Sequence, residues 1–189
     1  MMGLGLLRAA SLGLLAAASV PALAAPPEAA PADGDDWDPS TVSLADALAC
    51  KVARRDYTGW SLWLYDNAAA RRHYGMTKVP SANPFLAEYR LARPVAVFGR
   101  TTTRIAFTGS GILGVFAEAS PDGLARTLGV ARDSALPGFL GERVLLDARV
   151  DLDGTGIVAR EKVALNVSVV ASHPGKVLAG CSYRFDILE

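Results

Sequence analysis

The fold of this chain is decided near its C-terminus by the stretch VLAGCSYRFDI, residues 177–187. Its odd-numbered residues, from Val177 to Ile187, are apolar or cysteine, whereas Ser182, Arg184 and Asp186 occupy the positions between them. Side chains of a β-strand point alternately to its two faces, so this pattern predicts a half-buried strand.

Two earlier segments show the same period of two. Their apolar positions are Val144, Leu146, Ala148 and Val150 in the first, and Val163, Leu165, Val167 and Val169 in the second. The connections at 152–156 and 173–176 contain Asp-Gly and Pro-Gly, which are typical of tight turns. We therefore expect an antiparallel three-stranded meander of half-buried strands, with Cys181 on its core face.

Upstream, the sequence predicts shorter elements. Residues 89–98, 104–107 and 112–118 are expected to be strands, and Pro94 indicates an edge position or a bulge. Residues 123–132 are expected to form a helix before the final meander.

An N-terminal helix is predicted from Ser43, a capping hydroxyl three residues before Asp46. Leu44, Leu48 and Val52 would form its core stripe. Cys50 lies on another side of such a helix, so either the helix ends near Cys50 or another segment covers that side.

These elements indicate an α+β fold, with short helices packed on antiparallel β-sheet in one domain at 41–189. Residues 44–48 and 124–128 are similar, and each precedes a strand-rich segment. The domain could therefore consist of two helix-plus-meander repeats, at 43–118 and 122–188.

The first 24 residues have the layout of a secretory signal peptide. Arg8 precedes an apolar run at 9–20, which is too short to span a bilayer, and Ala22-Leu23-Ala24 offers small residues for cleavage near Ala24. Residues 25–40 are rich in Pro and Asp and are expected to be a flexible tether. The mature chain is predicted to be soluble and periplasmic, or secreted, with no membrane span.

In such an oxidising compartment, Cys50 and Cys181 are expected to form a disulfide. No His lies at ligand spacing from either cysteine, which disfavours a metal site. Lys and Arg together number 19, as do Asp and Glu, so a nucleic-acid partner is not expected.

The order of elements in an exported chain resembles the β-lactamase-inhibitor-protein-like architecture. It is also similar to outer-membrane assembly lipoproteins of the SmpA/OmlA type. The resemblance covers about residues 43–188 at the level of element order and shares no motif. It implies an exported α+β fold, and no functional residue is carried over from it.

An aromatic and basic cluster is the candidate binding region, because such residues anchor interfaces and long loops often bind partners. Its members are Trp60, Trp63, Tyr65, Arg71, Arg72, His73, Tyr74 and Lys78. The alternative is that the two tryptophans fill the core and that the basic residues form a solvated loop.

Two motifs are interpreted as turns. Residues 109–114 match G-x-G-x-x-G, but no helix is expected to follow them, so a hairpin turn is favoured over a dinucleotide site. Residues 151–156 resemble the start of a calcium loop, but Lys162 occupies the position where a bidentate Glu is needed. No cofactor is expected.

The function predicted from sequence is a non-enzymatic binding or protein-interaction protein of the bacterial envelope, with another envelope protein as its partner. One alternative is a periplasmic hydrolase that uses His73 with a Ser or Asp brought near by folding. Another is a structural envelope component. His173, beside Pro174-Gly175, is expected to be exposed in a turn, and the oligomeric state is left open.

Overall fold

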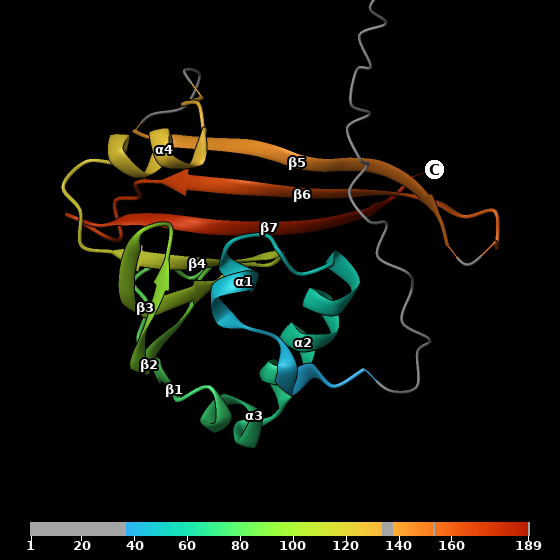
Figure 1. Cartoon of the computed structure of the whole chain (residues 1–189), viewed down its shortest axis with the longest axis horizontal. Helices are drawn as coiled ribbons and strands as arrows, with labels where there is room; N and C mark the ends of the chain where they lie inside the picture. The colour runs from blue at the N-terminus through green and yellow to red at the C-terminus, as the bar shows by residue number, and fades with distance from the viewer. Residues whose placement is uncertain (1–36, 134–137, 153, 189) are drawn as a thin grey trace, which may run out of the picture. The chain divides into compact units, whose positions relative to one another are not determined.

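The computed structural model describes residues 37–133, 138–152 and 154–188, which contain one antiparallel sheet and several short helices (Figure 1). The helices are η1 (Pro39–Thr41), α1 (Leu44–Leu48), α2 (Arg54–Asp66), α3 (Ala68–His73) and α4 (Asp122–Leu128). The strands are β1 (Met76–Val79), β2 (Ala87–Val97), β3 (Arg100–Phe107), β4 (Gly111–Phe116), β5 (Leu140–Asp151), β6 (Val158–Ser168) and β7 (Val177–Ile187). The predicted α+β fold is confirmed. The expected signal peptide and residues 25–36 of the expected tether lie outside the described residues.

The sheet has the order β1-β2-β3-β4-β7-β6-β5 and joins two meanders. The C-terminal meander, β5-β6-β7, is the one predicted from the alternating pattern. The other is β2-β3-β4, and pairing of β4 with β7 makes one continuous sheet. The described residues after 122 contain no counterparts of α2, α3 and β1, and the division into repeats stays a prediction.

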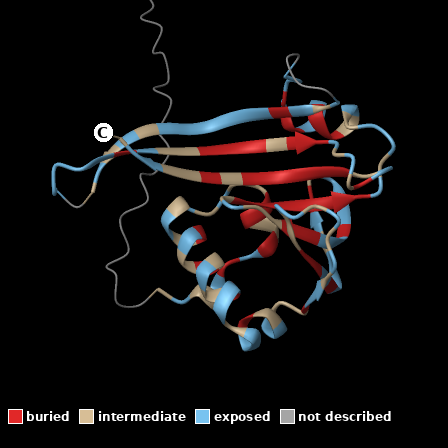
Figure 2. Cartoon of the chain, turned by 180° about the vertical axis from the view of Figure 1, so that it is seen from behind, coloured by how far each residue is buried: buried red, intermediate tan, exposed pale blue. Residues whose placement is uncertain are grey.

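The core lies between the helices and one face of the sheet. Leu48, Trp60 and Leu124, from α1, α2 and α4, share one buried cluster with sheet residues such as Ile105 and Val167. Figure 2 shows buried residues concentrated in β4, β6 and β7, whereas β5 is largely exposed.

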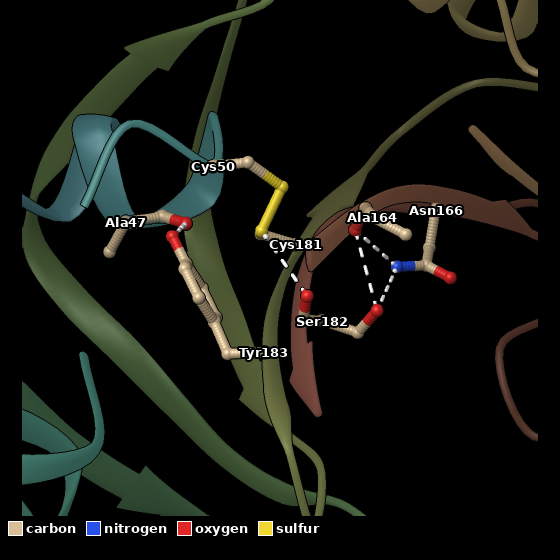
Figure 3. Close-up of a disulfide and its surroundings, with 7 residues drawn as sticks. All are labelled: Ala47, Cys50, Ala164, Asn166, Cys181, Ser182 and Tyr183. Atoms are coloured by element: carbon tan, nitrogen blue, oxygen red, sulfur yellow. Dashed lines mark hydrogen bonds between the residues drawn. A yellow bond between two sulfur atoms is a disulfide. The ribbon is translucent and has the colours of Figure 1, made fainter. Parts of the chain in front are cut away.

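A disulfide between Cys50 and Cys181 joins the end of α1 to β7, with Cα atoms 5.2 Å apart (Figure 3). The helix ends before Cys50, which has a left-handed φ of 59°. The backbone N–H groups of Cys50 and Lys51 donate to carbonyls of the last helical turn, as in a Schellman motif. This turn answers the question left open by the helical pattern, because it directs Cys50 toward the sheet.

Residues 144–150 form a strand as expected, and Ala148 and Val150 alternate with exposed neighbours, but the expected half-burial is wrong for the first part of the segment. Val144, Leu145 and Leu146 are each 42–43% exposed, because β5 is the last strand of the sheet. A bulge at Leu145 also shifts the register between Val144 and Leu146. Pro94, by contrast, lies in a register shift of β2, in agreement with the predicted bulge.

No helix among the described residues has both the length and the apolar character that crossing a membrane requires.

Candidate binding site

Helix α2 is held on the sheet by a buried stripe. Tyr57, Trp60 and Leu64 follow helical spacing and are almost completely buried. The Tyr57 ring stacks on Tyr183 of β7 with ring centroids 4.0 Å apart. Burial raises the pKa of both phenols, because loss of water around them disfavours the charged phenolate.

The side of α2 next to this stripe exposes two large apolar side chains, Leu62 at 60% and Tyr65 at 76%. Both line a pocket of about 170 Å³ between α2 and the sheet, here called the α2 pocket. Its remaining lining residues are Tyr57, Ser61, Leu64, Arg71, Met76, Ala87, Tyr89, Phe107, Thr108, Gly109 and Ser110.

The α2 pocket has an apolar floor and a polar rim. The rings of Tyr89 and Phe107 meet edge to face there, 5.8 Å apart, beside the buried Met76. The β3–β4 turn at 108–110 supplies hydroxyl and backbone groups at the rim. Pockets for drug-sized ligands measure about 300–1,000 Å³, so this one suits a single ring or a branched aliphatic side chain.

Arg71 of α3 closes one end of the α2 pocket. Its Nη1 atom donates to the carbonyls of Leu64 and Tyr65, at 2.5 and 2.7 Å. These are among the last carbonyls of α2, which have no partner within the helix. Arg71 therefore fixes the end of the helix that carries Tyr65.

Of the eight candidate residues from the sequence, Tyr65 and Arg71 line the α2 pocket and the others do not. Trp60 is fully buried and Trp63 packs against the same core, as the core alternative expected. The Tyr74 hydroxyl bonds to backbone near η1, and it is 2.7 Å from the Val42 carbonyl oxygen.

The remaining three candidates, Arg72, His73 and Lys78, are exposed. The expectation that they lie in a long loop is wrong, because α3 and β1 occupy most of that segment. Helix α3 begins with three alanines and is capped by Asn67. The Asn67 side chain accepts hydrogen bonds from the N–H groups of Ala69 and Ala70.

His73 ends α3 and packs edge to face on the neighbouring ring of Tyr74. Among the described residues it makes no hydrogen bond to a hydroxyl or a carboxylate. The same part of the chain contains no group of His, Cys, Asp and Glu able to hold a metal ion. The 109–114 motif spans the end of the β3–β4 turn and the start of β4, so the hairpin predicted there is confirmed.

Sequence reasoning missed a buried polar cluster around Glu88 of β2. Glu88 is 1% exposed, and its carboxylate contacts Arg104 Nε at 2.6 Å and His173 Nε2 at 3.2 Å. The expected exposure of His173 is therefore wrong: it is 6% exposed, and its Nδ1 lies 2.9 Å from Ser172 Oγ.

Burial raises the pKa of Glu88, but hydrogen bonds from Ser81, Arg104 and His173 outweigh it, so the net shift is downward. The members of this cluster come from separate segments of the chain, and nothing in their local sequences pairs them.

Comparison with models of protein families, with curated proteins and with solved structures finds no match to this chain. The identification of the α2 pocket as a candidate binding site therefore depends on its geometry alone.

Proposed function

We propose that this protein is an exported, non-enzymatic binding protein of the bacterial envelope, and that it holds a partner protein at the α2 pocket. The observation that carries the proposal is the apolar α2 pocket with Leu62 and Tyr65 exposed at its mouth. Exposed apolar groups around a concavity favour association, because binding removes their surface from water.

The size of the pocket favours a protein partner over a free ligand. At about 170 Å³ it accepts one side chain, and the exposed rim extends the contact over α2. Interfaces obtain most of their affinity from a few anchors of this kind.

Export is supported by the signal-like layout of residues 1–24 and by the disulfide, since disulfides persist mainly in oxidising compartments. Non-enzymatic action is supported by His73, which makes no hydrogen bond to a hydroxyl or a carboxylate among the described residues. A purely structural role is the alternative, and it would leave the α2 pocket without an occupant.

The proposal is tested by placing a photoreactive phenylalanine analogue at Tyr65 and irradiating intact cells. The expected result is one specific cross-linked envelope protein. Ala69 is the matched control position, because it is exposed on α3 and does not line the pocket.

Leu62→Asp should abolish capture by the photoreactive Tyr65 position, since it places a charge at the apolar mouth. Ala69→Asp should leave capture unchanged. Cross-links that are absent, or insensitive to Leu62→Asp, would contradict the proposal.

A further inference from the structure

From Glu142 onward, one side of the β5 backbone has no partner among the residues that the structure describes. Strand β5 ends the sheet and pairs only with β6, whereas the segment before it covers the start of the strand, where Asp133 N donates to Leu140 O at 2.7 Å. From Glu142 to Asp151, no described residue forms a backbone hydrogen bond to the free side. An unpaired strand edge is a template for another strand.

Two backbone hydrogen bonds show which residues of β5 direct their N–H and C=O groups to the free side. The carbonyl of Leu140 accepts on that side, and the direction alternates along an antiparallel strand, so the backbone groups of Glu142 and Val144 also point outward. At the other end, Leu152 N bonds to Ile157 O across the hairpin, so Asp147, Arg149 and Asp151 point outward. The bulge at Leu145 explains why the outward positions change from even to odd.

The outward residues are self-complementary about one point. Suppose that two antiparallel β5 strands are related by a two-fold axis between Leu145 and Leu146. Glu142 of each copy then lies opposite Arg149 of the other, and Val144 of each copy lies opposite Asp147 of the other. Shifting the register by two residues in either direction places Glu142 opposite Asp147 or Asp151 instead. Like charges directly opposite each other are destabilising, so charge selects the centred register.

The centre of this register is apolar. Val144, Leu145 and Leu146 are each about two-fifths exposed. At the axis, Leu145 of each copy would lie opposite Leu146 of the other, with Val144 beside them. The two charged residues that flank this apolar centre, Glu142 and Arg149, differ in their ion pairs within the chain. Glu142 bonds to Lys162 and Arg184 on the helix-free face, whereas Arg149 has no ion-pair partner among the described residues. The second copy's Glu142 would supply one.

We propose that two copies of this chain associate through antiparallel pairing of their β5 strands over residues 142–149, which extends the sheet across a two-fold axis. This interface is separate from the α2 pocket and does not depend on the function proposed for that pocket.

Sedimentation of the disulfide-bonded protein over a range of concentrations tests the association. The expected result is a reversible dimer that weakens at least tenfold on Arg149→Glu, because this variant places two Glu side chains opposite each other. Arg93→Glu, with the same charge change on exposed β2, should sediment like the parent. A parent protein that stays monomeric up to its solubility limit would overturn the proposal. This holds even if the β5 edge then proves to bind a different protein.

Cross-linking tests the register. Cysteines replacing Glu142 and Arg149 together should give a disulfide-linked dimer on mild oxidation, since these positions in one chain are roughly 24 Å apart and cannot join to each other. Cysteines replacing Glu142 and Asp147 should link much more slowly. Equal rates, or a faster 142/147 link, would refute the centred register, and circular dichroism of each variant verifies folding.

Discussion

Tyr74 illustrates how a side chain suited to recognition can instead hold the molecule together. Its hydroxyl lies 2.7–3.2 Å from the carbonyl oxygens of Pro39, Ser40 and Val42, and its ring packs on Trp60. The hydroxyl therefore ties η1 to the helices that follow it.

Tyr74→Phe should lower the free energy of unfolding by about 1 kcal/mol, since a buried carbonyl loses its donor. Urea denaturation measures this loss. Tyr65→Phe is the control, because Tyr65 is largely exposed and makes no side-chain hydrogen bond among the described residues. Equal stability of the two variants would contradict the structural role of Tyr74.

Glu88 should make stability depend on pH. Its pKa is lowered in the folded chain, so its charge stabilises the fold above the usual value of 4.5, and this stabilisation is lost as the pH falls through the lowered value. Glu88→Gln should therefore destabilise the protein near pH 7 and reduce the further loss between about pH 5 and pH 3. Unfolding free energies of parent and variant, measured across this pH range, test the prediction. Parallel curves would contradict the role of the Glu88 charge in the pH dependence of stability.

Single residues were predictable where their environment is local. The cap at Ser43 and the turn at 109–111 depend on neighbours in sequence, and both form as expected. The environment of His173 was not predictable, because Glu88 lies on a strand 85 positions earlier. The α2 pocket is equally non-local, since Tyr65 meets Phe107 and Ser110 only through the packing of α2 on the sheet.

At the scale of elements, the pairing of β4 with β7 holds the two meanders in one sheet. Gly180 of β7 lies opposite Leu113, and a Cβ atom at Gly180 would overlap the Ile112 carbonyl and lie 2.8 Å from Leu113 Cα. The two backbones approach too closely for any side chain at this position.

Gly180→Ala should therefore destabilise the chain by about 1–3 kcal/mol, because the neighbouring backbone must move. Gly109→Ala is the matched control, since no atom lies within 4 Å of its Cβ position and its φ is not positive. Thermal unfolding of both variants measures the difference, and equal midpoints would show that the β4–β7 junction tolerates a side chain.

The alternating pattern predicted elements better than it predicted their burial. It located β6 and β7 and the faces that they bury. In the first part of β5 the same pattern failed to predict burial, because periodicity indicates a strand but not its place at the end of a sheet. The segment after Asn67 was predicted as a loop from its polar residues, yet its alanines and cap form α3.

In the whole molecule, separate regions have separate roles. The disulfide and the β4–β7 junction stabilise the domain, the α2 pocket is proposed to bind a partner, and β5 is proposed to pair with a second copy. The length of the chain and the order of its expected elements predicted one α+β domain, whereas the pocket and the free edge emerged only from the packing of the sheet.

The central claim, that a partner occupies the α2 pocket, is tested most directly through Met76. The chain contains three methionines, Met1, Met2 and Met76, and Met76 lies in the pocket at 7% exposed. In protein produced from residue 25 onward with labelled methionine methyl groups, Met76 gives a single NMR resonance. Addition of the partner identified by cross-linking at Tyr65 is predicted to shift this resonance in the parent and not in Leu62→Asp. Binding of that partner with an unchanged Met76 resonance would contradict the account.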